Sequence, residues 1–315
     1  MRVVTVTVVV PSFRRPEQLA RALPAVIDQV RELGADDGFE ASVLVVDNDS
    51  SGSATAVVRH LGSPLVRYVI EPAPGISAAR NRGLDETSTA DALVFIDDDE
   101  SPRPAWLRSL VDTWRETGAT AVMGRVISEY VSEPDAWVAA GQFFRRPSRV
   151  TGTRIPVAAA GNLLLDVAQV RELGLRFDDR FGLSGGEDTL FSRQLVARGG
   201  TIVWCEESVA TDYVPAARAT REWVLGRARR SGNTATLVDL CMAGSASARL
   251  GVRAGAIVGG LARAGAGGAR YLAGLAAGSA WHQARGLRTA NRGIGMMSAA
   301  VGTSVQEYAR DEVAV

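Results

Sequence analysis

The sequence predicts an α/β fold with a mostly parallel central sheet and a helical C-terminal extension. Short β-branched or apolar runs alternate with longer amphipathic stretches through the first 116 residues, as in parallel strands joined by helical crossovers. Each run ends in a polar loop, and in such sheets these loops gather along one edge. From residue 241 the composition changes to alanine, glycine and arginine, with apolar residues at helical spacing.

Four strand–helix units come first, and further elements follow. The expected strands cover residues 3–10, 42–46, 65–70 and 92–96, and the helices after them cover 16–33, 54–61, 76–85 and 105–116. We then expect strands over 120–126 and 201–204 and helices over 190–197 and 220–231. The stretch 132–153 is irregular and too long for a simple turn, so we expect a mobile loop that contacts substrate. The arginines of 218–230 either bind a diphosphate or lie on a solvated helix face.

The composition excludes several kinds of site. None of the 35 basic residues is lysine, which excludes a Walker A loop and a pyridoxal Schiff base. His60, His282, Cys205 and Cys241 lack the spacing of a zinc or redox motif. The formal net charge is +0, so we expect no nucleic-acid partner. The N-terminal apolar run is too short for a secretory signal, and we therefore expect a cytoplasmic protein.

The strand 92–96 ends in the most informative motif, four consecutive acids from Asp97 to Glu100. These carboxylates repel one another, so a divalent cation among them would stabilise the fold. Ligation by oxygen alone suits Mg²⁺ or Mn²⁺. The alternative is a solvated acidic turn.

Polar residues at the other strand ends suit a nucleotide. Asp47 follows the strand 42–46 and can accept hydrogen bonds from a ribose or a base, while Arg80 can offer a planar fork to a phosphate. The alternative is that Asp47 and Asp49 only turn the chain and cap the next helix. Because polar residues follow four successive strands, we favour the nucleotide site.

A second cluster, residues 182–189, combines glycines with two acids. Gly185 and Gly186 precede Glu187 and Asp188, which begin the helical run 190–197. Glycine lets the backbone approach a ligand closely, and carboxylates are favoured at a helix N-terminus. One of these acids is the candidate general base. Ordinary capping of the first turn is the alternative.

Five segments, taken together, resemble the family 2 glycosyltransferases, which have the GT-A fold. In chain order they read VVVPSFRRP, VVDNDSS, PGISAARNRGL, VFIDDDE and GGEDTLFSRQLVARGG. The likeness is strongest to bacterial exopolysaccharide-type members, in which the GGED segment leads to a tryptophan strand and a Val-Pro-x-x-Arg turn, here residues 214–218. The resemblance covers residues 1–235, the expected catalytic domain, and leaves 236–315 as a helical extension rich in alanine, glycine and arginine.

The resemblance implies a role for each motif residue. Nucleotide contacts would come from the set Pro11, Asp47, Asn48, Arg80, Asp97 and Asp98. Asp97 and Asp99 would be the ends of the DxD motif and hold the metal, and Asp188 would be the catalytic base. Gly186 and Glu187 would support the acceptor side of the site. Many relatives have a histidine near the position where this chain has Asp212, which leaves the third metal contact open.

The predicted function is therefore a metal-dependent, inverting glycosyltransferase. It would use Mg²⁺ or Mn²⁺, a nucleotide-sugar donor, and a glycan or polyprenyl-linked acceptor. A sugar nucleotidyltransferase is one alternative, although its usual early glycine-rich loop is absent from PSFRRP. A non-catalytic scaffold that binds a sugar or a lipid is the other. The sequence does not indicate the oligomeric state.

The C-terminal segment 241–306 contains no acidic residue. At 100° per residue, its apolar side chains fall on one side of a helix and Arg249, Arg253, Arg263 and Arg270 on the other. This pattern is typical of a helix lying in an anionic membrane surface, here the inner face of the cell membrane. A helical hairpin packed on the catalytic domain or on a second subunit is the alternative. The glycines at 259–260 and 265–268 weaken this argument from helical phase, because they can break a helix.

Overall fold

The structure is a computed structural model that describes residues 2–304. The chain divides into two compact units. The sheet unit comprises Met1–Ile127, Arg146–Gly182 and Glu187–Asp212, and the helical unit comprises Ser128–Arg145, Leu183–Gly186 and Tyr213–Val315. The predicted boundary at residue 235 lies inside a helix of the second unit, and the division into a catalytic domain and an extension stays a prediction.

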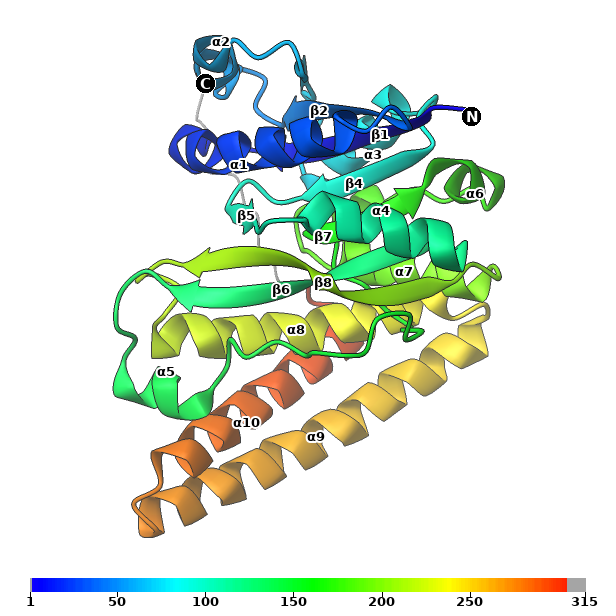
Figure 1. The fold of residues 1–315 in the computed structure, drawn as a ribbon. Helices are drawn as coiled ribbons and strands as arrows, with labels where there is room; N and C mark the ends of the chain where they lie inside the picture. The colour runs from blue at the N-terminus through cyan, green and yellow to red at the C-terminus, as the bar shows by residue number, and fades with distance from the viewer. Residues whose placement is uncertain (1, 305–315) are drawn as a thin grey trace. The chain divides into compact units, whose positions relative to one another are not determined.

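An eight-stranded sheet organises the first unit, in the order β3-β2-β1-β4-β7-β6-β8-β5 (Figure 1). The strands are β1 (Val4–Ser12), β2 (Phe39–Asp47), β3 (Val66–Ile70), β4 (Ala92–Ile96), β5 (Glu100–Pro102), β6 (Ala121–Tyr130), β7 (Asn162–Asp166) and β8 (Ile202–Val214). β1 pairs in parallel with β2 and β4, and β2 with β3. β7 runs antiparallel to both β4 and β6, and β5 antiparallel to β8. The predicted α/β fold is confirmed.

Two apolar cores cover the two faces of this sheet. On one face Val8 and Val94 pack with residues of α1 (Pro16–Gly34) and α4 (Trp106–Thr117). On the other face Val9 and Phe95 pack with Phe191 of α7 (Glu187–Ala197). All five residues of β4 are buried, since the strand is covered on both sides. The remaining helices of the unit are α2 (Thr55–Leu61), α3 (Ile76–Glu86), α6 (Val167–Glu172) and the short η1 (Asp179–Phe181).

Several elements differ from those predicted. β7 and α6 were not predicted, and β8 continues to Val214 rather than ending at Trp204. The stretch 132–153, predicted to be a loop, contains the short helix α5 (Ala136–Gly141), which Asp135 caps by accepting hydrogen bonds from two backbone amides. The predicted helix 220–231 is longer, because α8 (Arg221–Met242) continues for three further turns.

The C-terminal segment forms two antiparallel helices, α9 (Ala246–Ala276) and α10 (Ala280–Ala300), and α10 also packs on α8 (Figure 1). The glycines at 259–260 and 265–268 do not break the helix: α9 continues through them, and Gly260 and Gly267 face α10 at very close approach. A Cβ on Gly267 would lie 2.6 Å from the carbonyl oxygen of Gly286. No helix within residues 2–304 combines the length and the apolar character needed to cross a bilayer.

Candidate active site

The acidic run after β4 is held partly by side chains that follow β1. The Ser12 hydroxyl donates to Asp98 at 2.7 Å. Arg15 Nη1 lies 3.3 Å from Asp98 Oδ1 and 3.2 Å from Asp99 Oδ2. Burial nevertheless raises the pKa of Asp98 to about 6. One arginine therefore offsets only part of the charge of the acidic run.

Asp97 and Glu100 turn toward a common space beside Gly161. A Cβ on Gly161 would lie 2.9 Å from Asp97 Oδ2 and 2.9 Å from Glu100 Oε1. Burial raises the pKa of both carboxyls. Neighbouring negative charges raise them further: those of Asp99 and Asp188 raise the pKa of Asp97, and those of Asp97 and Asp212 raise the pKa of Glu100. Glu100 Oε2 is buried without a hydrogen-bond partner among the described residues. This corner of the sheet thus carries excess negative charge.

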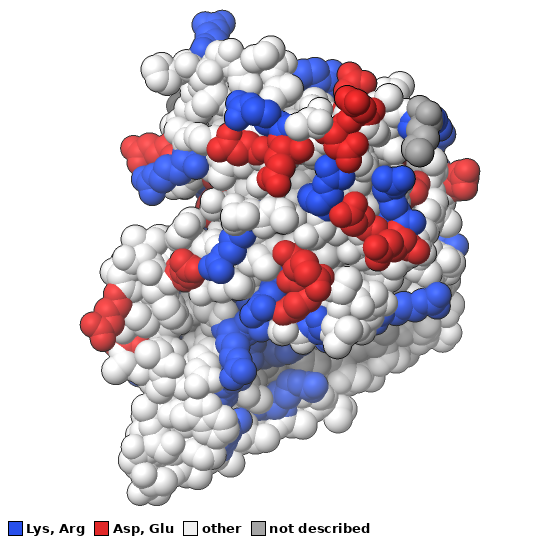
Figure 2. Space-filling model, in the orientation of Figure 1, with Lys and Arg blue, Asp and Glu red and all other residues white. Residues whose placement is uncertain are grey.

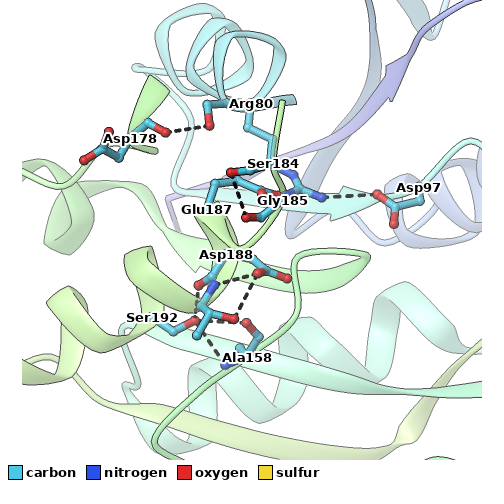
Figure 3. A network of polar contacts seen from close by, with 11 residues as sticks. Arg80, Asp97, Ala158, Asp178, Ser184, Gly185, Glu187, Asp188 and Ser192 are labelled. Carbon is cyan, nitrogen blue, oxygen red and sulfur yellow. Dashed lines mark hydrogen bonds and ion pairs between the residues drawn. The ribbon is translucent and has the colours of Figure 1, made fainter. Parts of the chain in front are cut away.

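Arg80 connects the acidic strand end to the first turn of α7 (Figure 3). The side chain comes from α3 and is buried. Its Nη1 forms an ion pair with Glu187, its Nη2 lies 3.4 Å from Asp97 Oδ1, and its guanidinium lies 5.7 Å from the Phe177 ring centroid. One cation thereby joins the two acidic motifs, which are 90 residues apart in the sequence. The predicted contact of Arg80 with a nucleotide stays a prediction.

The two acids that begin α7 have different environments. Glu187 is buried, and burial raises its pKa to about 7 although Arg80 opposes the shift. Asp188 is only partly buried; its Oδ1 accepts hydrogen bonds from the Thr189 backbone N–H at 2.6 Å and from the Thr189 hydroxyl at 3.2 Å. The Ser192 hydroxyl holds this turn, since it accepts from Ala158 N–H at 3.1 Å and lies 2.7 Å from the carbonyl oxygen of Asp188. Glu187 therefore points into the protein, and Asp188 is the acid more open to a ligand.

Asp47 and Asn48 shape the loops around the ends of β2 and β3. The fully buried Asp47 accepts hydrogen bonds from Ala54 N–H at 2.7 Å and Tyr68 O–H at 2.9 Å. Asn48 donates to the carbonyl oxygen of Ala73 at 2.6 Å and accepts from Gly75 N–H at 2.9 Å. Both side chains thus stabilise these loops by hydrogen bonds, as the alternative interpretation of the sequence expected for Asp47. Their contacts with a nucleotide stay predictions.

Three further predicted residues occupy distinct positions. Pro11 is buried in β1 opposite Val46. Gly186, in the helical unit, has a φ of +95°, a conformation that favours glycine. Asp212 pairs with Glu100 across β8 and β5, and Arg146 lies 2.6 Å from its Oδ2. Arg146 comes from the stretch that was predicted to contact substrate.

The described residues do not form a preassembled metal cluster: between residues 2 and 304 no three His, Cys, Asp or Glu side chains are grouped closely enough to hold an ion. What the sheet unit does bring together is Asp97, Arg80, Glu187 and Asp188, with Asp99 beside them at the strand end. Asp99 and Asp188, whose charges act on Asp97, carry carboxylate oxygens, the ligand type of Mg²⁺ and Mn²⁺. Gly161, Ser12 and Arg15, which the sequence did not single out as site residues, complete this group.

Comparison with known proteins identifies the family. Residues 7–174 match the sequence profile described as "Glycosyl transferase family 2". The chain is also 36% identical over 234 residues to the succinoglycan biosynthesis protein ExoM of Rhizobium meliloti (strain 1021), a match covering 71% of each chain. The chain belongs to glycosyltransferase family 2. This glycosyltransferase is also 26% identical over 241 residues to the pre-mycofactocin glycosyltransferase of Mycobacterium tuberculosis (strain CDC 1551 / Oshkosh), covering 74% of this chain and 47% of that one.

Solved structures confirm the GT-A fold of this family 2 glycosyltransferase. It matches the crystal structure of GalNAc-T7 with UDP, GalNAc and Mn²⁺ with a TM-score of 0.54 at 16% identity, covering 73% of this chain and 48% of that one. It matches Staphylococcus aureus TarS with a TM-score of 0.52 at 12% identity, covering 80% and 42%. The chain thus spans less than half the length of either protein, and these likenesses concern the fold alone.

Proposed function

We propose that this family 2 glycosyltransferase moves a sugar from a nucleotide-sugar to a hydroxyl of a glycan or lipid-linked acceptor, in a metal-dependent reaction that inverts the anomeric centre. One observation carries the proposal: Asp97, at the end of β4, and Asp188, at the start of α7, lie close enough for the charge of Asp188 to raise the pKa of Asp97. A donor diphosphate and an acceptor hydroxyl need such separate acids within one site.

Asp97 and Asp99 would hold Mg²⁺ or Mn²⁺. The excess negative charge around Asp97 and Glu100 supports this assignment, because a cation relieves the repulsion that raises their pKa values. The GalNAc-T7 structure, which contains Mn²⁺ and UDP, also favours it. When bound, the ion would neutralise the diphosphate that leaves the sugar. Asp98, buried between them, would fix the two outer acids through Ser12 and Arg15.

Asp188 would take the proton from the acceptor hydroxyl as that oxygen attacks the face of the sugar opposite the diphosphate. Its partial exposure supports this role, whereas Glu187 is buried against Arg80. Glu187 would position Asp188, because the pair with Arg80 fixes the start of α7 relative to Asp97. Gly186, with its positive φ, would keep the backbone beside the base free of a side chain.

The remaining motif residues would bind the nucleotide through the loops that they shape. Asp47 and Asn48 fix the loops after β2 and β3, and Pro11 ends the apolar part of β1 next to them. These loops, with Arg80 and Asp98, would surround the base, ribose and diphosphate.

We also propose that α9 attaches the protein peripherally to an anionic membrane surface. Its outward face exposes apolar side chains, namely Leu250, Ile257, Val258, Leu261, Leu272 and Leu275, with Val258 68% and Leu261 59% exposed. Arg253 and Arg270 turn the other way, since Arg253 donates to the carbonyl oxygen of Ala300 and Arg270 lies 4.4 Å from the Trp281 ring. Figure 2 shows arginines but no acidic atoms over α9 and α10. Such a surface suits the inner face of a bacterial membrane and a lipid-linked acceptor.

A ligand screen tests the catalytic proposal. Nucleoside diphosphates and nucleotide-sugars are added to the full chain with Mn²⁺, and the melting temperature is measured. A ligand that binds only the folded state raises it, and we expect one nucleotide series to do so only when Mn²⁺ is present. If no nucleotide shifts the melting temperature in the presence of Mn²⁺, the donor proposal is wrong.

Flotation with vesicles tests the membrane proposal separately. Val258→Glu places a charge on the outward face of α9, and we expect it to lower binding of the full chain to phosphatidylglycerol vesicles. Val150→Glu is the matched control, because Val150 is 80% exposed in the sheet unit. Equal flotation of the two variants would exclude α9 as the membrane-binding face.

A further inference from the structure

The helical unit contains a small pocket that the proposed transfer reaction does not use. Its volume is about 180 Å³, and its lining includes Phe143, Phe144, Trp223, Arg227, Ser231 and Arg288. These residues come from the segment after α5, from α8 and from α10, all within one unit. Organic ligands of drug size fill roughly 300–1,000 Å³, so the pocket suits a single small group.

The pocket is electropositive. The residues that line it include no aspartate or glutamate. On α10, Arg285 and Arg292 lie one helical turn to either side of Arg288, and their charges, together with burial, lower the pKa of Arg288. Arg285 Nε is buried and has no hydrogen-bond partner among residues 2–304. An anion in the pocket would relieve this repulsion and accept hydrogen bonds from the lining Arg288.

Aromatic rings form the rigid part of the pocket. Phe144 and Trp223 stack with their centroids 5.7 Å apart at an interplanar angle of 16°. The guanidinium of Arg227 lies 5.1 Å from the Trp223 ring centroid and that of Arg285 lies 5.9 Å from the Phe143 ring centroid. Stacking on an aromatic face restrains a guanidinium. The Ser231 hydroxyl adds a neutral donor beside them.

We propose that this pocket binds a phosphate or diphosphate ester group, separately from the nucleotide-sugar. Planar arginine forks match the paired oxygens of such a group, and the volume excludes a whole nucleotide. The group would come either from a lipid headgroup, such as the carrier end of a lipid-linked acceptor, or from a soluble phosphate. The lipid source rests on the proposed function, whereas the anion site itself does not.

Binding of inorganic diphosphate to the full chain tests this site. The titration is made by calorimetry in EDTA, so that metal-dependent binding near Asp99 does not contribute. We expect binding that weakens at least about tenfold in Arg288→Gln, since a charge-assisted hydrogen-bonding partner is lost, and that Arg288→Lys partly restores. Arg263→Gln, on the exposed surface of α9, is the matched control and should bind like the wild type.

Two results would overturn the proposal. One is an absence of diphosphate binding by the wild-type chain; the other is unchanged binding by a folded Arg288→Gln variant. Flotation with phosphatidic acid vesicles separates the two sources of the phosphate. If a lipid supplies it, Arg288→Gln lowers flotation and diphosphate competes; if a soluble phosphate supplies it, diphosphate binds but flotation is independent of Arg288. Retained diphosphate binding without any Mn²⁺-dependent nucleotide binding would leave this site intact and refute the proposed function alone.

Discussion

The sheet unit and the helical unit differ in the sign of the charge that is left uncompensated. In the sheet unit, the buried Asp98 and the partly exposed Asp97 stand beside arginines that offset part of their charge, Arg15 for Asp98 and Arg80 for Asp97. In the helical unit, residues 241–306 contain no acid, and Arg288 is crowded by Arg285 and Arg292. The contrast fits the two proposals: the first unit would receive a cation together with an anionic donor, and the second would receive an anion.

The largest expected effect comes from the catalytic base. Asp188→Asn should lower transfer about 10³-fold, because general base catalysis contributes roughly 10²–10⁴, while Mn²⁺-dependent nucleotide binding stays unchanged. Asp179→Asn, an exposed acid of the same unit, is the control. Turnover by Asp188→Asn equal to that of the control would refute the assignment.

Loss of a metal ligand should weaken nucleotide binding, whereas loss of the base should slow the transfer reaction. Asp99→Ala is expected to weaken Mn²⁺-dependent nucleotide binding on the order of 100-fold, since a bound ion contributes several kcal/mol to diphosphate recognition. Titration of the best nucleotide from the screen, with Mn²⁺ and then with EDTA, measures this. If the variant binds as the wild type does in Mn²⁺, the sheet unit does not use Asp99 to hold a cation.

Stability of the metal-free protein should fall as the pH rises through the acidic range. The pKa of Asp98 is raised from 3.8 to about 6, so the folded state holds this proton more tightly than the unfolded state. The stabilisation is complete below pH 3.8, and between pH 3.8 and 6 it is lost, on the order of 3 kcal/mol. Urea unfolding in EDTA at several pH values should show this slope in the wild type and a smaller one in Asp98→Asn. Asp28→Asn, at an exposed acid, should keep the wild-type slope.

The helical unit should be most sensitive where its helices approach most closely. Gly267→Ala would place a Cβ 2.5 Å from Ala290 N, and we expect about 1–2 kcal/mol of destabilisation from overpacking. Gly265→Ala has open space around its Cβ, so helix propensity should stabilise it by up to about 1 kcal/mol. Hydrogen exchange of the α9 amides compares the two. Equal exchange rates would contradict the close packing of α9 on α10.

The sequence predicted the parallel half of the sheet because each of its strands is an apolar run that ends in polar turn residues. It did not predict β7, whose five residues lie within a stretch without periodicity, or the second half of β8, where Glu206 and Glu207 interrupt the apolar pattern. The continuity of α9 through its glycines was not predictable, because propensity is local, whereas the approach of α10 is not.

The candidate site was predictable only where a motif carries its own chemistry. The acidic run and the Glu-Asp pair were visible in the sequence, but the role of Arg80 as their link was not, because 107 residues separate it from Glu187. Gly161 gave no signal at all, since its importance lies in the space it leaves for Asp97 and Glu100. The charges of Arg285, Arg288 and Arg292 were visible, but only the fold combines Arg288 with Phe144 and Trp223 in one pocket.

A crystal structure of the protein with Mn²⁺ and its nucleoside diphosphate tests the central claim most directly. The account predicts the ion on Asp97 and Asp99, the diphosphate against the ion, and the Asp188 carboxylate facing the space where the sugar would stand. A nucleotide bound away from Asp97, or an Asp188 carboxylate turned away from that space, would contradict it.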